Sequence, residues 1–208
     1  MQICLFSILD ALCHTPSLPF GELEQNRLAA IRHPDRQKES LCALLALREL
    51  VGDFPLTIMR APEGKPYFDD PSAPPFSLCH TKAWAAAVLG DDHSGKVGID
   101  LEPLRPYPHA KSVAHRFFTP EEYAEFSAMD ENELAFFCIW TKKEALAKMS
   151  GTGLFAKEQS KPSFSTSFQL TSESESLILT VSAENAIPSI SWHSPSKEFY
   201  HFDIKELR

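Results

Sequence analysis

The sequence predicts an α+β protein that consists of two similar halves. Apolar runs typical of strands and segments of helical periodicity occur in the order strand, helices, strands, and this order occurs twice along the chain. The 208 residues are enough for two units of about 100 residues each, the size of a small domain. We therefore expect a first half over residues 1–96 and a second half over 97–208.

The first half is predicted to begin with a strand over residues 1–10 and two helices over 21–33 and 36–51. Pro34 separates the helices and Gly52 ends the second one. Four short extended runs, punctuated by Pro and Gly, follow at 55–60, 65–68, 76–81 and 85–90.

The second half is predicted to begin with a strand over residues 97–102 and a helix over 109–117. Thr119 is a good helix N-cap because Pro120 and two glutamates follow it. A longer helix over 131–149 is expected to end at Gly151. The remaining apolar runs predict strands at 163–170, 177–182, 189–194 and 199–204.

Composition excludes several classes of protein. Hydrophobic residues make up 43% of the chain, which is enough for a core, and the net charge of −8 argues against bulk attraction to nucleic acid. A run of about 18 apolar residues is missing, so we expect no membrane span, and the N-terminus is interpreted as a strand because it lacks the features of a signal peptide. The odd number of cysteines and their scattered positions favour a reducing cytoplasm over a disulfide framework or a zinc site; they are Cys4, Cys13, Cys42, Cys79 and Cys138.

The segment VGIDLE at 97–102 places two carboxylates on one face of a strand. Asp100 and Glu102 point to the side opposite Val97, Ile99 and Leu101 because strand side chains alternate. Two carboxylates this close repel each other unless a cation lies between them, and Mg²⁺ prefers such ligands together with phosphate oxygens and water. An ordinary strand with one solvated face is the alternative.

The segment WTKKEALAK places Trp140, Glu144 and Lys148 on one stripe of a helix, since they are four residues apart. The Glu–Lys spacing is also that of an ordinary surface pair. The preceding Phe136 and Phe137 leave little of this helix free for water, and this crowding favours a functional interpretation.

Taken together, these two segments, 44 positions apart from Asp100 to Glu144, resemble the signature of the 4′-phosphopantetheinyl transferase superfamily. Upstream, Gly64-Lys65-Pro66, Cys79-His80-Thr81 and Trp84 resemble a further block of that family, in which Ser usually stands at the place of Cys79. The histidine of HSG, His93, matches less well because it lies in a polar loop. The length suits the larger, surfactin-synthetase-activating (Sfp-like) type, a pseudo-dimer of two α+β halves in one chain.

The resemblance implies a function. A carrier-protein serine would attack the β-phosphate of coenzyme A, with Asp100, Glu102 and Glu144 holding Mg²⁺ (or Mn²⁺). Glu144 or another carboxylate would take the serine proton, and Lys148 would meet the pyrophosphate. We expect a cytoplasmic monomer that binds neither nucleic acid nor membrane.

The first half would supply the other phosphate contacts. Lys65 and His80, with Thr81 beside them, would bind phosphates, although a turn lysine and a core histidine remain alternatives for the first two. Basic residues near the junction of the first two helices would bind the 3′-phosphate of coenzyme A or form a solvated face; they are Arg32, Arg36 and Lys38.

The carrier would dock transiently on the segment that follows the carboxylate strand. This segment offers basic and apolar side chains together, which are also compatible with an ordinary amphipathic helix: Arg105, Lys111, Val113, Arg116, Phe117 and Phe118. Another Mg²⁺-dependent phosphotransferase or phosphodiesterase, and a non-catalytic coenzyme-A- or carrier-binding module, remain alternative functions.

Overall fold

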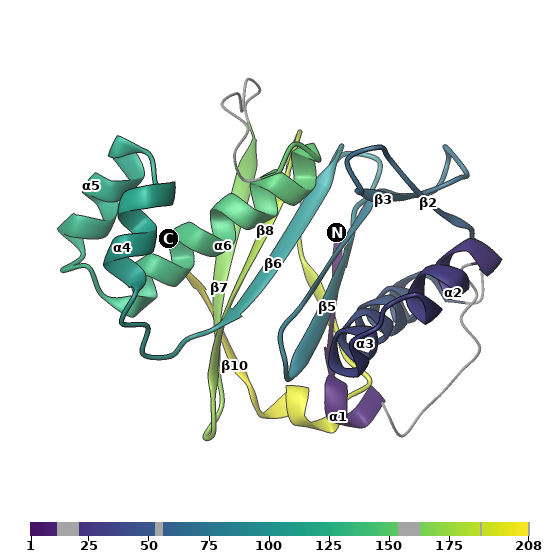
Figure 1. The fold of residues 1–208 in the computed structure, drawn as a ribbon, viewed down its shortest axis with the longest axis horizontal. Coiled ribbons are helices and arrows are strands. Elements are labelled where there is room, and N and C mark those ends of the chain that lie inside the picture. The colour runs from purple at the N-terminus through teal and green to yellow at the C-terminus, as the bar shows by residue number, and fades with distance from the viewer. Residues whose placement is uncertain (12–20, 53–55, 154–162, 188, 208) are drawn as a thin grey trace.

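The computed structural model describes residues 1–11, 21–52, 56–153, 163–187 and 189–207, and it contains two four-stranded sheets with one long helix against each (Figure 1). Elements of the first half are β1 (Gln2–Ser7), α1 (Ile8–Ala11), α2 (Gly21–Ala29), α3 (Pro34–Val51), β2 (Ile58–Arg60), β3 (Pro66–Phe68), β4 (Phe76–His80) and β5 (Trp84–Leu89). Those of the second half are β6 (Val97–Pro103), α4 (Ala110–Phe117), α5 (Pro120–Ala128), α6 (Glu133–Ser150), β7 (Phe164–Thr171), β8 (Ser176–Ala183), β9 (Ser191–His193), the 3₁₀-helix η1 (Lys197–His201) and β10 (Asp203–Leu207).

Three main strands have the same relative order in the two sheets: β4-β5-β1 in the first and β7-β8-β6 in the second. The first sheet has the order β4-β5-β1-β9 and the second the order β10-β7-β8-β6. In the first half β5 pairs antiparallel with β1 and β4, and in the second half β8 pairs antiparallel with β6 and β7. The first half also contains a separate two-stranded sheet, β2-β3, between α3 and β4. The short β9 belongs to the second half of the sequence but pairs in parallel with β1, so the C-terminal segment also extends the first sheet.

The sheets pack against each other between the helices, so that α3 lies on one side of the molecule and α6, with α4 and α5, on the other (Figure 1). Alternation along each strand produces this layering. Ile3 and Leu5 of β1 enter the core between the sheets, whereas Cys4 and Phe6 pack toward α3. Val97, Ile99 and Leu101 of β6 also enter the central core, as the alternation of VGIDLE predicts.

Local signals begin and end the helices where the sequence indicates. Thr119 caps α5 with a complete capping box, in which its side chain accepts from the Glu122 amide while the Glu122 carboxylate accepts from the Thr119 amide. Asn132 caps α6, and Gly151 ends it in the left-handed conformation at φ +77°. Among the described residues, no helix is long and apolar enough to cross a membrane.

Three predicted elements differ from the structure, and one is the helix predicted over 21–33, which ends at Ala29. The first strand ends at Ser7, and the chain turns there into α1, rather than continuing to residue 10. The strand predicted over 199–204 is wrong: residues 197–201 form η1, and β10 follows over 203–207. Phe199 and Phe202 are three residues apart, the period of a 3₁₀-helix, and both pack on the central core, while Tyr200 is exposed. Cys13 lies outside the described residues.

Candidate active site

Helix α6 lies in direct backbone contact with β6, and Gly98 makes this contact possible. A Cβ atom at Gly98 would lie 1.9 Å from the carbonyl oxygen of Ala145 and 2.6 Å from the amide nitrogen of Met149. Only glycine permits such an approach. The carboxylate strand and the charged helix stripe, which are 44 positions apart from Asp100 to Glu144, are thereby brought to one place.

An ion pair joins the two segments. The Lys148 ammonium donates to Asp100 Oδ1 at 2.6 Å, with about a tenth of the Asp100 side chain and a third of the Lys148 side chain exposed. Burial lowers the pKa of Lys148, but the charge and hydrogen bond of Asp100, together with other nearby groups including Glu144, outweigh burial and raise that pKa above the usual range. The other oxygen, Asp100 Oδ2, is buried and has no hydrogen-bond partner among the described residues. This orphaned oxygen is available to a ligand.

Two more carboxylates share this environment. Burial first, and the Asp100 charge second, raise the pKa of Glu102 to about 7. The same two causes raise the pKa of Glu144. The Asp100 charge thus acts on both glutamates and disfavours their ionised forms.

The chemistry of these donors fits a hard divalent cation. Mg²⁺ takes one or two carboxylates and completes its octahedron with phosphate oxygens and water, so a cage made only of protein is not required. As the side chains stand, the described residues contain no group of three His, Cys, Asp or Glu side chains arranged to hold a metal. The free Asp100 Oδ2 is nevertheless the kind of oxygen that such an ion would take.

A cavity of about 600 Å³ opens beside this cluster, between the two halves of the chain. Its lining includes four of the predicted site residues, Lys65, His80, Glu144 and Lys148. It also includes Arg27 of α2 and Arg60 of β2, which the sequence analysis did not identify. Five side chains that carry or can gain a positive charge thus line one cavity, which favours an anionic ligand.

The two additional arginines share one buried carboxylate. Glu24 is only 3% exposed, and its Oε1 accepts from Arg27 Nε at 2.6 Å and from Arg60 Nη2 at 2.9 Å. Arg60 also donates to the carbonyl of Gly64 at 3.1 Å. Glu24 and Arg27 are three residues apart on α2, the spacing of an ordinary helix pair. Arg60 comes from β2 and Gly64 from the turn before β3, so sequence spacing does not predict the complete cluster.

Lys65 is turned toward the end of α6. Its ammonium donates to the carbonyl of Met149 and, at 3.3 Å, to that of Val97. Burial, and then the nearby Lys96, lower the pKa of Lys65 to about 8. Lys65 thus ties the Gly-Lys-Pro turn to both α6 and β6 at the wall of the cavity.

His80 lies at the end of β4, where its Nδ1 is 3.3 Å from the Glu39 carboxylate of α3. Burial lowers the pKa of His80, and the Glu39 charge partly offsets this effect. The adjacent Thr81 uses its hydroxyl within the turn to β5, accepting from the amide of Trp84 at 3.0 Å.

A second cavity lies on the other side of His80. Arg36, Lys38 and Lys82 line it, together with His80 and Thr81. Arg32 is exposed and lines neither of these two cavities. The predicted basic cluster is therefore divided, and only Arg36 and Lys38 approach His80.

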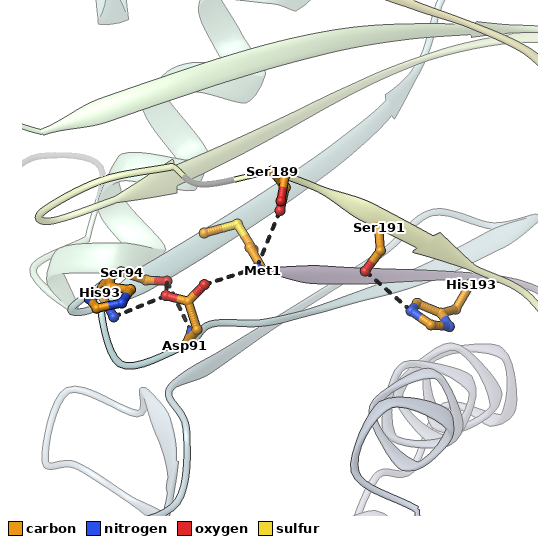
Figure 2. Close-up of polar contacts among 7 residues, drawn as sticks. All are labelled: Met1, Asp91, His93, Ser94, Ser189, Ser191 and His193. Atoms are coloured by element: carbon orange, nitrogen blue, oxygen red, sulfur yellow. Dashed lines mark hydrogen bonds and ion pairs between the residues drawn. The ribbon is translucent and has the colours of Figure 1, made fainter.

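Cys79 and His93 both lie away from the first cavity. The Cys79 thiol packs into the core between the sheets, and burial raises its pKa to about 12. His93 is exposed in the turn before β6, where Asp91 Oδ1 accepts from the His93 amide at 3.0 Å and Asp91 Oδ2 pairs with the Met1 amino group at 3.0 Å (Figure 2).

The segment predicted to meet a carrier forms the start of the α4–α5 region. Val113 and Phe118 pack partly into the aromatic core beneath it, and Phe117 contacts Trp140 edge-on. The Arg116 guanidinium lies over the Phe117 ring at 5.1 Å, and Lys111 pairs with Glu131. Part of the apolar surface is therefore used in the core, while the basic groups stay outside.

Comparison with known proteins agrees with the signature. The family model of the 4′-phosphopantetheinyl transferase superfamily matches residues 96–200. A putative 4′-phosphopantetheinyl transferase of Synechocystis is 29% identical over 63% of this chain and 56% of its own length. The 4′-phosphopantetheinyl transferase AcpT of Salmonella typhimurium is 32% identical over 65% of this chain and 70% of its own length. HetI of Nostoc, also named a 4′-phosphopantetheinyl transferase, is 36% identical over 46% of this chain and 42% of its own length.

The mixed α+β fold has a cavity lined with cationic side chains beside a group of carboxylates. These features define the class of a candidate phosphate-binding protein. The chain belongs to the 4′-phosphopantetheinyl transferase superfamily, as the two signature segments predict.

Proposed function

We propose that the protein transfers the 4′-phosphopantetheine of coenzyme A to a serine of an acyl or peptidyl carrier protein. The serine oxygen forms a bond to the β-phosphorus, the bond from that phosphorus to the bridging oxygen breaks, and adenosine 3′,5′-bisphosphate leaves. The observation that carries the proposal is the Lys148–Asp100 pair, set among Glu102 and Glu144 beside a cavity lined with cationic side chains.

Each side chain has a role in this proposal. Lys148 neutralises charge on the pyrophosphate, and Glu144, whose raised pKa suits a proton acceptor, takes the serine proton. Asp100, Glu102 and Glu144 hold Mg²⁺, or Mn²⁺ in its place. When bound, this ion neutralises phosphate charge and orients the phosphate oxygens.

The adenosine bisphosphate part would occupy the first cavity. Lys65, His80 and Thr81 remain the proposed phosphate contacts, with Arg32 and Arg36 for the 3′-phosphate. The geometry adds Arg27 and Arg60, because these two line the same cavity as Lys65 and Lys148. Dephospho-coenzyme A should therefore bind more weakly than coenzyme A. Added salt should reduce this difference in affinity, because it screens the charge of the 3′-phosphate.

Calorimetric measurement of ligand affinity in two matched variants distinguishes which arginine contacts the 3′-phosphate. Arg27→Gln should remove the preference for coenzyme A over its dephospho form if the first cavity holds the 3′-phosphate. Arg36→Gln should do so if the second cavity holds it. Equal binding of both ligands by the unaltered protein would contradict a 3′-phosphate site in either cavity.

Several finer features of the protein belong to the same proposal. The repeated strand order supports a pseudo-dimer of two halves, 1–96 and 97–208, of the surfactin-synthetase-activating (Sfp-like) type, with β9 crossing to the first sheet. Arg105, Lys111 and Arg116 would receive the carrier transiently. We expect a monomer that acts in the cytoplasm.

Mass spectrometry of an apo carrier tests the function directly. Incubation with coenzyme A, Mg²⁺ and this protein should add the mass of phosphopantetheine to the carrier, and omission of Mg²⁺ should prevent it. Turnover of a nucleotide without a carrier would favour another phosphotransferase, and binding of coenzyme A without transfer would favour a non-catalytic module.

A further inference from the structure

A chain of buried hydroxyl groups connects α6 to the second sheet. Thr141 Oγ1 donates to the carbonyl of Phe137 at 2.8 Å and lies 2.7 Å from Thr180 Oγ1 of β8. Thr180 Oγ1 in turn lies 2.8 Å from Ser167 Oγ of β7. Because a carbonyl only accepts, the donors run in one order, from Ser167 to Thr180, from Thr180 to Thr141, and from Thr141 to the carbonyl of Phe137.

This hydroxyl chain is enclosed by protein. Thr141 and Thr180 are both fully buried, so water does not replace their partners. Leaving a buried hydroxyl without a hydrogen-bond partner costs free energy. Each of these hydrogen bonds therefore favours the one position of the helix in which it can form. The apolar contacts of α6 lack this directionality.

The hydroxyl chain and the Lys148–Asp100 pair attach α6 to residues that lie opposite one another on neighbouring strands. Thr180 is the register partner of Asp100 on one side and of Ser167 on the other. Lys148, bonded to Asp100, follows Thr141 by seven residues, about two helical turns. A shift of α6 along the sheet would therefore break both attachments.

We infer that Thr141 and Thr180 are positioning residues, which fix the register of α6 so that Lys148 meets the substrate phosphate and Glu144 meets the attacking serine. The inference rests on the proposed function for its catalytic consequence, whereas the fixed register is a property of the fold. The contact at Gly98 sets how close α6 comes to β6, and the hydroxyl chain sets where along the strands it stops.

Thr141→Val tests this role because valine keeps the shape and removes the hydroxyl. We expect kcat for carrier loading to fall at least about tenfold while KM for coenzyme A changes less than about twofold, because a small displacement affects aligned phosphoryl transfer more than binding. Thr141→Ser, which keeps the hydroxyl, should restore kcat. Hydrogen exchange of the Glu144–Lys148 amides should accelerate in Thr141→Val and return to normal in Thr141→Ser.

The Ser165–Ser182 pair provides a matched control. Their hydroxyls lie 2.8 Å apart on the same two strands, and Ser182 is fully buried. Ser182→Ala should lower the melting temperature by a few degrees, much as Thr141→Val does, and leave kcat and the α6 amides unchanged. If Thr141→Val does not fold, Ser167→Ala removes only the outer donor and should give a smaller acceleration of the same amides.

Two outcomes would overturn the inference. One is unchanged exchange of the Glu144–Lys148 amides in a folded Thr141→Val protein, and the other is an equal effect of Ser182→Ala on kcat and on those amides. If the unaltered protein loads no carrier, the proposed function fails, but the exchange measurements still decide whether the hydroxyl chain fixes α6.

Discussion

The two long helices of the protein cover their sheets in chemically opposite ways. Both α3 and α6 have 18 residues, and each lies on the face of a sheet with the same order of main strands. Beneath the centre of α3 the sheet offers apolar side chains, and a polar contact to the sheet, from His80 to Glu39, lies near the helix start; the apolar ones include Cys4, Phe6, Ala85, Ala87 and Leu89. Beneath α6 the corresponding face carries polar groups and a glycine: Gly98, Asp100, Thr180 and Ser182.

This difference separates a stabilising interface from a functional one. Apolar contacts at α3 contribute stability without demanding any particular partner. Polar groups at α6 must each be paired, and the structure pairs them through the hydroxyl chain, the Ser165–Ser182 contact and the Lys148–Asp100 contact. The unpaired oxygen of Asp100 is an exception that points to a ligand. Bond-making chemistry is therefore expected at α6, whereas α3 is expected to supply only ligand contacts such as Arg36.

Replacing Asp100 should have the largest effect. Asp100→Ala removes the partner of Lys148 and the orphaned oxygen together, so carrier loading should fall at least about a thousandfold. Mass spectrometry measures loading, and circular dichroism checks that the chain stays folded. Asp100→Asn keeps the shape and should lose activity similarly, while Asp92→Ala in the exposed turn should not. Near-normal loading by both Asp100 variants would remove the distinction between the two interfaces.

Glu144→Gln should lower kcat by at least about a hundredfold, on the scale of general acid–base contributions. The melting temperature should stay close to that of the unaltered protein, because an amide replaces a half-buried carboxylate of raised pKa without changing its size. Steady-state kinetics with an apo carrier measures the effect. Glu133→Gln, in the exposed first turn of the same helix, is the control, and equal activity of the two variants would make Glu144 an ordinary surface residue.

Gly98→Ala tests the close contact beneath α6. The new methyl group would overlap the carbonyl of Ala145, so the helix must move away and stability should fall by about 3 kcal/mol. Urea unfolding measures this loss. Gly52→Ala at the end of α3, where a Cβ would meet nothing within 4 Å, should lose less despite its positive φ. A stable and fully active Gly98→Ala protein would show that the approach of α6 to β6 is not required.

Cys4→Ser should have the smallest effect and should change stability alone. It places a hydroxyl in the fully buried apolar interface beneath α3, where it costs about 1–2 kcal/mol if unpaired. Carrier loading at a temperature well below the melting point should be unchanged. A loss of activity without a loss of stability would show that α3 takes part in the chemistry.

Local sequence signals predicted most elements of the fold because each has a nearby cause. Thr119 marks the start of α5 through its own hydroxyl and amide, and Gly151 marks the end of α6 through its left-handed backbone. The alternation of VGIDLE separates its core face from its carboxylate face. The strand predicted at 199–204 failed because Phe199 and Phe202 reach the core through a 3₁₀ turn. Alternation along an apolar run does not reveal which core its side chains enter, because this depends on the tertiary structure.

The sequence by itself determined the family and the carboxylates and lysine of the signature, because these lie within two short segments of fixed spacing. Only the tertiary structure decided that Arg27 and Arg60 line the cavity through a shared Glu24, and that Arg32 lies outside it. It also decided that Thr141 reaches Thr180. The physical reason is that Arg60 reaches Glu24, and Thr141 reaches Thr180, from separate helices and strands, whose distances are set by packing of the sheets and not by position along the chain.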